Sequence, residues 1–449
     1  MEQLTKNQTS QELLDFINKS PCCFYAIQNV CKKLKGAGFV EITEKELWHL
    51  ERGKSYFVCR NSSSIVAFTI PENAKCEQFK ICASHSDSPS FKIKGEGELK
   101  EEKIYTKLNV EKYGGMLCAP WFDRPLSVAG RIICKADSSD FSKVHFVEKL
   151  VNVDRDLLLI PNLAIHLNHD ANKTPNYNVQ NNMLPIFSCG QSGAGFWKTI
   201  ASCAEVPLES IVGSDLFLYN RDRGTFWGEQ NEFIASPRLD DLECVFTTLK
   251  GFLDSEKNAI SVFCVFDNEE VGSETRQGAA STFLRDCLFR INFSLGGNDE
   301  TYCTALANSF FVSADNAHAF HPNYASSSDP QNRPKINAGP VIKFNGAQKY
   351  TSDSYSSAVF REACSVAKVP FQIYTNRSDI AGGSTLGNIS NTQVSIPAVD
   401  VGIAQWAMHS PLESAGSLDP EMMVKAIKAF YELQWDFKET NFSHSAKDL

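Results

Sequence analysis

Several short segments of the chain combine acidic residues with histidines, or place acidic residues side by side, at spacings that suit metal binding. They are His85-Ser-Asp87, Asp240-Asp241, Asp267-Asn-Glu269-Glu270 and Asp315-Asn-Ala-His318, and a further histidine stands in Met408-His409. Imidazole nitrogens and carboxylate oxygens are ligands that zinc accepts. A carboxylate-rich set can also hold two metals that share one aspartate, and two neighbouring metals together activate a water molecule and polarise a carbonyl group. These residue types therefore predict a hydrolytic metal centre.

The doublet Glu269-Glu270 offers two roles within such a centre. Hydrolysis needs a general base beside the activated water, and one glutamate could bind metal while its neighbour takes the proton. Taken singly, each segment also has an ordinary structural explanation. An acidic doublet is commonly a solvated turn or a charge pair at a helix N-terminus, and His409 could be a histidine near the core. The hypothesis therefore depends on whether the segments converge.

Hydrophobic patterning places most of the segments at the carboxyl ends of predicted strands, and Asp240 at the start of a predicted helix over residues 238–252. The buried-strand runs lie at residues 79–83, 260–266, 309–313 and 397–403. In an open α/β sheet, ligands bind beyond the carboxyl ends of the strands. We therefore expect the acidic residues and histidines to meet at one edge of one sheet.

The rest of the pattern indicates one α/β domain that is split by an insertion. Further helices are expected at residues 11–36 (interrupted at Pro21), 354–369 and 422–437, and further strands at residues 56–59, 64–70 and 371–374. Between residues 91 and 233, short alternating stretches separated by turns indicate a mostly β region. Within it, residues 169–182 are expected to form an exposed loop.

The predicted fold class is therefore a mixed-sheet α/β core with an inserted, mostly β domain. The catalytic core is expected to span residues 1–90 and 234–449, and the insertion residues 91–233. A chain of 449 residues can bury such a core without stapling by disulfides or structural metals.

Composition argues against several classes of partner. The net charge is −9 and no basic cluster stands out, which argues against nucleic-acid binding. The apolar runs are too short to span a bilayer, and the polar N-terminus lacks the apolar core of a signal peptide. The 15 cysteines are scattered without a CxxC motif, which favours free thiols in a reducing compartment. We therefore expect a cytoplasmic protein without a membrane anchor.

Several multi-residue blocks resemble the aspartyl aminopeptidases, a family of dinuclear zinc exopeptidases that includes vacuolar aminopeptidase I. The similarity runs nearly from end to end. It is clearest in the blocks at residues 84–89, 236–240, 267–273, 313–324 and 407–410. The resemblance implies a zinc-exopeptidase core, an inserted dimerisation domain, and dimers that assemble into a dodecamer. It also implies peptide substrates and two Zn²⁺ ions per subunit.

The resemblance assigns roles to individual residues of the predicted centre. His85 and Asp315 would bind one zinc, Glu270 and His409 the other, and Asp240 would bridge them. Glu269 would be the general base for a metal-activated water, and Asp87 would orient His85, because a ligating histidine commonly donates its other N–H to a carboxylate.

The resemblance also implies a substrate site. His166 would reach into the active site of a neighbouring subunit, and Lys343, near Tyr350, would meet an acidic N-terminal side chain. Asp379, Gly382 and Gly383 would line the site for the substrate backbone. This last segment, Arg377-Ser-Asp379-Ile-Ala-Gly-Gly-Ser-Thr385, departs from the run expected in the family.

The expected function is release of N-terminal residues, with Asp and Glu preferred. Because of the departure in the segment after Arg377, an aminopeptidase of neutral or broad specificity is the main alternative. A related dimetal N-acyl deacylase or carboxypeptidase is a second alternative, and it would spare peptides with a free amine. A non-catalytic assembly protein is a third, although it would normally lack one of the ligands or the base.

Overall fold

The computed structural model describes residues 7–73, 75–136, 143–173, 176–190 and 195–436. Its centre is a nine-stranded sheet with the order β1-β2-β3-β13-β4-β14-β18-β16-β17. The strands are β1 (Val40–Ile42), β2 (Lys54–Arg60), β3 (Ser64–Ile70), β4 (Phe79–His85), β13 (Ile260–Phe266), β14 (Phe310–Ala314), β16 (Val341–Phe344), β17 (Gln372–Thr375) and β18 (Ala398–Gly402).

The four middle strands of this sheet are parallel. β13 pairs with β4, β4 with β14, and β14 with β18, all in the parallel sense. Every residue of β4, β13, β14 and β18 is buried, as expected for strands that are covered on both faces. Their carboxyl ends therefore share one edge, where polar side chains beyond the strands come together.

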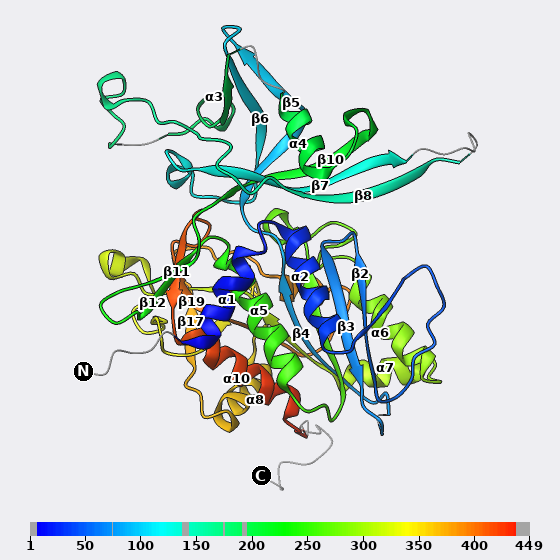
Figure 1. The fold of residues 1–449 in the computed structure, drawn as a ribbon. Coiled ribbons are helices and arrows are strands. Elements are labelled where there is room, and N and C mark those ends of the chain that lie inside the picture. The colour runs from blue at the N-terminus through cyan, green and yellow to red at the C-terminus, as the bar shows by residue number, and fades with distance from the viewer. Residues whose placement is uncertain (1–6, 74, 137–142, 174–175, 191–194, 437–449) are drawn as a thin grey trace.

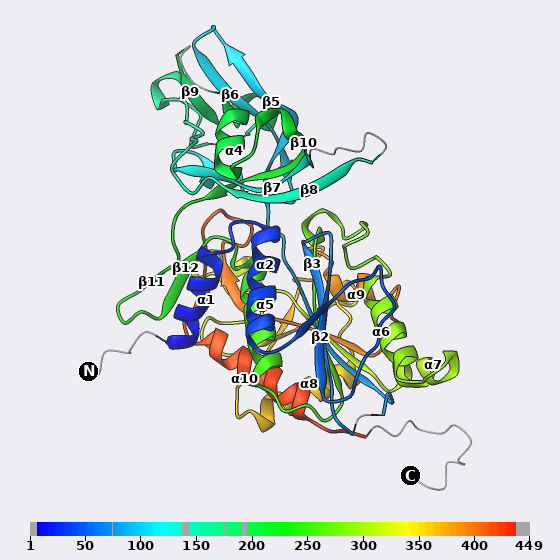
Figure 2. The ribbon, with the colours of Figure 1, turned by 45° about the vertical axis from the view of Figure 1, so that its right-hand side comes forward.

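Helices cover both faces of the sheet, as Figures 1 and 2 show. One layer packs a large apolar cluster against the first face, and a second layer buries a separate cluster against the other. The first layer consists of α1 (Gln8–Asn18), α2 (Cys23–Gly36), α5 (Leu239–Asp254), α8 (Ser354–Val366) and α10 (Asp419–Glu432). The second consists of α6 (Phe283–Ser294), α7 (Asp299–Ala307) and α9 (Leu386–Ser390).

A six-stranded antiparallel sheet with its own apolar cluster lies beyond one end of the central sheet (Figure 2). Its order is β8-β7-β10-β5-β6-β9. The strands are β5 (Ser90–Glu101), β6 (Tyr105–Tyr113), β7 (Leu126–Ala136), β8 (His145–Asn152), β9 (Ile186–Cys189) and β10 (Ile211–Asn220). The helices of this region are η1 (Ala119–Trp121), η2 (Ile165–Leu167), α3 (Val179–Asn182), α4 (Phe196–Ala204) and η3 (Leu208–Ser210).

A third sheet, of five strands, lies beside the carboxyl edge of the central one and has the order β11-β12-β20-β19-β15. Its strands are β11 (Thr225–Trp227), β12 (Phe233–Ser236), β15 (Ala317–His318), β19 (Ala404–Trp406) and β20 (Glu413–Gly416). Two 3-10 helices, η4 (Glu269–Val271) and η5 (Pro322–Ser327), follow β13 and β15. The loop between β19 and β20 contains His409.

The fold confirms the predicted class, and several predicted elements differ from the structure in their bounds. The segment 169–182 is not loop throughout, since Val179–Asn182 forms α3, where the Asn178 side chain accepts a hydrogen bond from Asn181 N. The last helix begins at Asp419, with Pro420 in its first turn, and ends at Glu432, whereas the prediction ran from 422 to 437. Residue 437 lies outside the described residues.

Among the described residues, no helix is long and apolar enough to cross a membrane. The division into a core and an insertion at residues 90 and 234 stays a prediction. The strands of the six-stranded sheet fall between Ser90 and Asn220, and β11 pairs with β12 in the third sheet.

Candidate metal centre and active site

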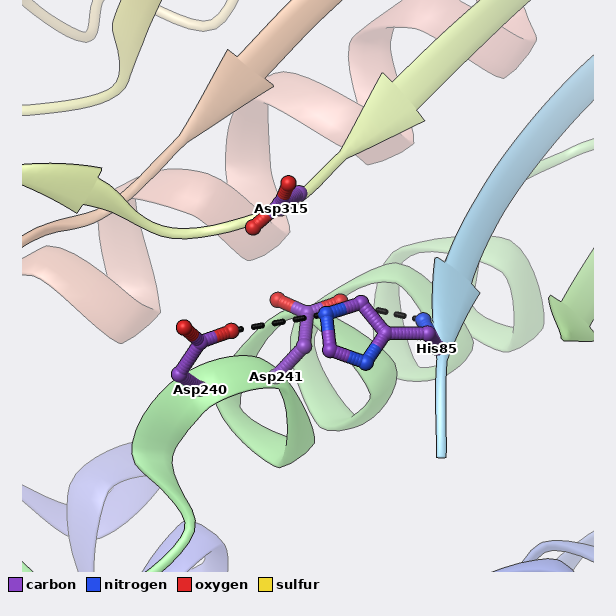
Figure 3. Close-up of side chains that lie close together, drawn as sticks. All are labelled: His85, Asp240, Asp241 and Asp315. Atoms are coloured by element: carbon purple, nitrogen blue, oxygen red, sulfur yellow. Dashed lines mark hydrogen bonds and ion pairs between the residues drawn. The ribbon is translucent and has the colours of Figure 1, made fainter. Parts of the chain in front are cut away.

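The carboxyl edge of the central sheet brings the predicted ligands together. His85 is the last residue of β4, Asp315 directly follows β14, and η4 with its two glutamates lies just beyond β13. Asp240 and Asp241 lie at the start of α5, where their φ and ψ angles are not helical. Figure 3 shows four of these side chains facing one another across the sheet edge.

One group of possible ligand atoms comes from His85, Asp240, Asp241 and Asp315, and these atoms all lie within 4.8 Å of one another. His85 Nε2 is 3.4 Å from Asp240 Oδ1. The backbone N–H of His85 donates to Asp241 Oδ2 over 3.1 Å, as drawn in Figure 3. All four residues are almost fully buried.

A second group comes from Asp240, Glu270 and His409, again within 4.8 Å. His409 Nε2 is 3.4 Å from Asp240 Oδ2 and 3.4 Å from Glu270 Oε2. Asp240 therefore belongs to both groups and turns one carboxylate oxygen toward each histidine. A third set, within the same limit, joins Glu269 to His85 and Glu270.

The donor set fits divalent cations. Among the described residues, Asp241 Oδ1 and Glu270 Oε1 are buried without a hydrogen-bond partner. Such oxygens are costly to desolvate unless a cation or donor satisfies them. Burial, followed by repulsion from Asp240, raises the pKa of Glu270 well above its usual range. The nitrogen and oxygen donors, with no thiolate among them, suit zinc.

Burial also raises the pKa of Glu269 to about 8, and the nearby carboxylates of Asp315 and Asp87 act in the same direction. Glu269 is thus a partly buried carboxylate beside the donor groups, which is the position of a general base in metal-assisted hydrolysis. A bound cation would lower the proton affinity of this carboxylate, because an opposite charge nearby favours the ionised form.

Asp87 connects the histidine to the glutamates. Its Oδ1 is 3.4 Å from His85 Nδ1, and its backbone carbonyl is 3.1 Å from the same nitrogen. The backbone N–H groups of Glu269 and Glu270 both donate to the Asp87 carboxylate over 3.1 Å. Tyr113 from β6 donates its hydroxyl to Asp87 Oδ2 over 2.7 Å. The position of Asp87 therefore suits the predicted role of orienting His85. Its carboxylate also holds the turn that carries Glu269 and Glu270.

The sequence prediction did not include three residues that contact this centre: Asp241, Tyr113 and Glu413. The sequence predicts a role for Asp240 and none for its neighbour Asp241, although Asp241 contributes to the first donor group. Glu413 accepts hydrogen bonds from Asp240 N over 3.0 Å and from His409 N over 2.8 Å. Glu413 and Tyr113 lie in strands of other sheets, and nothing in their local sequence signals that contact.

The predicted substrate residues Lys343 and Tyr350 lie beside the first donor group. Lys343 Nζ donates to the backbone carbonyl of Asp315 over 2.8 Å and lies 3.5 Å from Asp315 Oδ2. It also lies 5.3 Å from the centre of the buried Tyr350 ring. Although burial opposes the charge, the neighbouring Asp315 carboxylate helps to hold the pKa of Lys343 above its usual range.

Other predicted substrate residues lie around a neighbouring pocket. Gly382 and Arg377 line a pocket of about 640 Å³ beyond the ends of β16 and β17. The exposed Asp379 pairs with the Arg377 guanidinium over 2.6 Å. Gly383 is exposed nearby, with open space around its Cα.

His166 lies apart from the donor groups in this single chain. It is exposed in η2, between the exposed side chains of Ile165 and Leu167. Among the described residues, none of the polar contacts at the donor groups involves His166. A contribution from His166 to catalysis would therefore require a second subunit.

Comparisons with known proteins identify the family to which the chain belongs. A sequence model of the family described as aminopeptidase I zinc metalloprotease (M18) matches residues 16–431. The probable M18 family aminopeptidase 2 of Clostridium novyi (strain NT) is 45% identical over 434 residues, which cover 95% of this chain and 99% of that protein.

Two solved structures share the fold over most of the chain. One chain in a cryo-EM structure of the Ape4 and Nbr1 complex is similar with a TM-score of 0.90 at 34% identity, covering 94% of this chain and 85% of that one. A structure of the S. cerevisiae mApe1 dodecamer gives a TM-score of 0.82 at 25% identity, with 95% and 97% covered. The chain belongs to the M18 family of aminopeptidase I zinc metalloproteases, and it is a metallo-aminopeptidase with the mixed α/β fold of that family.

Proposed function

We propose that each subunit holds two zinc ions at the carboxyl edge of the central sheet. His85 and Asp315 would bind one ion and Glu270 and His409 the other, with Asp240 shared between them. The observation that carries this proposal is the position of Asp240, whose ligand atoms belong to both donor groups and whose two oxygens face different histidines.

When bound, such a pair of zinc ions would activate a water molecule and polarise the carbonyl of the scissile bond. Glu269 lies among the same donor atoms and would take the proton from the attacking water, then give it to the departing amine. Asp87 keeps His85 and the backbone of both glutamates in place through the contacts described above.

We further propose that N-terminal Asp and Glu are preferred. The support is Lys343, whose ammonium group lies beside Asp315 and carries three N–H donors. Two of them point to the carbonyls of Asp315 and Asn316, which leaves one for a substrate carboxylate. A charge-assisted hydrogen bond of this kind is roughly twice as strong as a neutral one.

Neutral or broad specificity is a second candidate, and the same lysine supports it. Lys343 is only 2% exposed, and its charge is already compensated by Asp315 at 3.5 Å. In that case the ammonium group would position Asp315 and would not select the substrate. Removal of the Lys343 charge distinguishes the two candidates: it should abolish a preference for Asp and Glu, and it should leave a broad specificity unchanged.

We propose that the protein acts as a homo-oligomer in the cytoplasm, with residues 91–233 as its dimerisation region. The apolar side chains of Leu163, Ile165 and Leu167 are exposed around His166, as in a surface that a second subunit covers. The similar S. cerevisiae mApe1 is a dodecamer. All 15 cysteines are free, which is consistent with a reducing compartment.

The decisive experiment is hydrolysis of a panel of X-Ala dipeptides, with N-acetylated peptides as controls, before and after chelation and zinc add-back. We expect chelator-sensitive cleavage of Asp-Ala and Glu-Ala, with the acetylated peptides untouched. The variant Lys343→Met should lose this preference while it still cleaves Leu-Ala. Lys349→Met, in the neighbouring pocket, is the matched control and should behave like the parent protein.

Cleavage that favours Leu-Ala in the parent protein, and that Lys343→Met does not redirect, would support broad specificity. Cleavage of the acetylated peptides with no cleavage of free-amine peptides would contradict the aminopeptidase mechanism proposed for this site. Elemental analysis of zinc in the zinc-loaded parent protein would show whether it binds two ions per subunit.

A further inference from the structure

The side chains of Cys31 and Cys59 face each other between α2 and β2, and neither belongs to the candidate donor groups. Cys31 lies in α2 and Cys59 in β2, and their sulfur atoms are 3.4 Å apart. Both side chains are partly buried and pack against the apolar cluster between the helices and the sheet. A disulfide bond is about 2.05 Å long, so the two sulfurs would need to approach by about 1.4 Å.

This contact distinguishes the pair from the other cysteines. Among the described residues, which include all the cysteines, no other two cysteine sulfurs are in hydrogen-bond contact. Cys303 and Cys203 are exposed without such a neighbour, and many others lie inside the core. Two thiols in contact at a partly exposed position can be oxidised to a disulfide by an added oxidant, whereas a single thiol has no partner for this reaction.

The surroundings favour Cys31 as the nucleophile. A hydrogen bond from the Cys59 thiol lowers the pKa of Cys31, and the ammonium group of Lys35 acts in the same direction. Burial and the carboxylate of Glu41 oppose this, and Glu41 is itself paired with Lys35 at 2.6 Å. The same hydrogen bond raises the pKa of Cys59, so Cys31 reaches the thiolate form first.

We propose that Cys31 and Cys59 form a modification site at which a peroxide produces a disulfide between α2 and β2. The Cys31 thiolate attacks hydrogen peroxide, an S–O bond forms, the O–O bond breaks, and the departing hydroxide takes a proton to become water. Cys59 then attacks the sulfenic acid sulfur, the S–S bond forms, and the S–O bond breaks. The second hydroxide takes the Cys59 proton and leaves as water, so peroxide is reduced and both sulfurs are oxidised.

The cross-link would join two elements that are separated by β1 in the chain, without touching the residues assigned to catalysis. A cross-link between two cysteines that are 28 positions apart in the chain lowers the conformational entropy of the unfolded state. For a chain of this size the expected rise in Tm is on the order of 4 °C. A thiol reductant would reverse it.

The test uses the zinc-loaded, full-length protein and hydrogen peroxide. After oxidation, free thiols are blocked with N-ethylmaleimide under denaturing conditions, and the protein is digested without reductant for mass spectrometry. We expect a peptide pair linked through Cys31 and Cys59 that is lighter by two hydrogens than the separate peptides. We also expect the rise in Tm in the parent protein and in Cys303→Ser, but not in Cys59→Ser.

Dimedone, which traps sulfenic acids, gives an independent readout. It should label Cys31 several-fold more in Cys59→Ser than in the parent protein, because the resolving thiol is absent. Cys59→Ala serves the same purpose if the serine variant does not fold. The proposal is overturned if peroxide leaves both thiols free for N-ethylmaleimide in the parent protein, if Cys31 pairs with another cysteine, or if dimedone labels Cys31 equally with and without Cys59.

Discussion

The carboxylate of Asp240 lies between two imidazole rings, with Oδ1 3.4 Å from His85 Nε2 and Oδ2 3.4 Å from His409 Nε2. Its backbone N–H is fixed by Glu413, and its carbonyl accepts a hydrogen bond from Ser88 over 2.8 Å. Because hydrogen bonds hold both the N–H and the carbonyl of Asp240, its carboxylate would lose little conformational entropy on binding cations. Its neighbour Glu269, by contrast, contributes to a group that lacks Asp240.

Glu269→Gln is expected to retain both zinc ions and to lose about 10²–10⁴ in kcat, the usual contribution of a general base. The substitution removes the proton acceptor but keeps the shape of the side chain. The measurements are steady-state kinetics with a dipeptide and zinc content by elemental analysis.

Asp240→Asn is the matched comparison, because it should lower the zinc content of both sites. If Glu269→Gln loses zinc in the same way, then Glu269 is a ligand and its assignment as the base is wrong.

Glu413→Gln is expected to weaken zinc binding by about 10–100-fold, the range for groups that hold metal ligands in place. Each Glu413 oxygen accepts a backbone N–H, one from Asp240 and one from His409. The amide NH₂ of glutamine cannot accept either bond, so one ligand loses its anchor. Competition with a fluorescent zinc chelator would measure the change.

Glu421→Gln on the outer surface of α10 is the control for this variant, since Glu421 pairs with Lys425 and contacts no ligand. Equal zinc affinity of Glu413→Gln and the parent protein would show that Glu413 does not position the ligands.

At the scale of elements, the closeness of β18 and β14 places Asp315. The strands pair in parallel up to Ala314, and Asp315 N then donates to Val401 O over 3.0 Å. Gly402 at the end of β18 makes this approach possible, because a Cβ atom there would lie 2.0 Å from the Asp315 carbonyl oxygen. Lys343 from β16 donates to that same carbonyl, so contacts from three strands position Asp315, one of the proposed ligands.

Gly402→Ala is therefore expected to lower the free energy of unfolding by about 1–3 kcal/mol, the usual cost of overpacking. It should also reduce zinc affinity, because the backbone that must move carries Asp315. Chemical denaturation and zinc titration of the same sample would check both effects.

Gly36→Ala is the control, since nothing lies within 4 Å of the added Cβ at the end of α2. Its stability should be unchanged or slightly raised, because alanine is a better helix former than glycine. A Gly402→Ala variant with the stability and zinc affinity of the parent protein would contradict the role given to this close approach.

At the scale of the whole molecule, the loop after β6 contacts the loop that carries His409 at the candidate metal centre. His409 Nδ1 contacts the carbonyl of Gly115, and Leu117 N donates to the His409 carbonyl over 3.1 Å. Tyr113, at the end of β6, reaches Asp87 on the other side. β6 and the loop after it thus contact residues on both sides of the candidate centre, whereas His166 in η2 faces solvent in the single chain.

If His166 completes a neighbouring site, mixed oligomers should recover activity that neither parent variant has. We expect His166→Ala and Glu269→Gln to be nearly inactive alone. Co-expressed with different tags and purified through both, they should show clearly higher activity, because one site then combines an intact Glu269 with His166 from the other subunit.

Co-expression of Glu269→Gln with Asp240→Asn is the control. Each of these substitutions disables the site of its own chain, so mixing the subunits repairs neither site. Equal activity of the two mixtures would place His166 outside the neighbouring active site.

The sequence by itself determined the α/β core. It also determined which strands are followed by acidic residues or histidines, and that carboxylate oxygens and imidazole nitrogens are the available metal donors. Continuous apolar runs such as residues 260–266 predict a buried strand, because a parallel strand covered on both faces excludes polar side chains. Since parallel strands end at one edge, the convergence of His85 and Asp315 also followed from their place after such runs.

Tertiary structure alone decided which distant residues support the ligands. Glu413 lies in β20 and Tyr113 in β6, and their contacts arise from how the sheets pack, which short-range periodicity does not encode. The burial of Lys343 against Asp315 likewise depends on the pairing of β16 with β18. Local pattern specifies an element and its buried face, whereas contacts between elements are set by the packing of the whole chain.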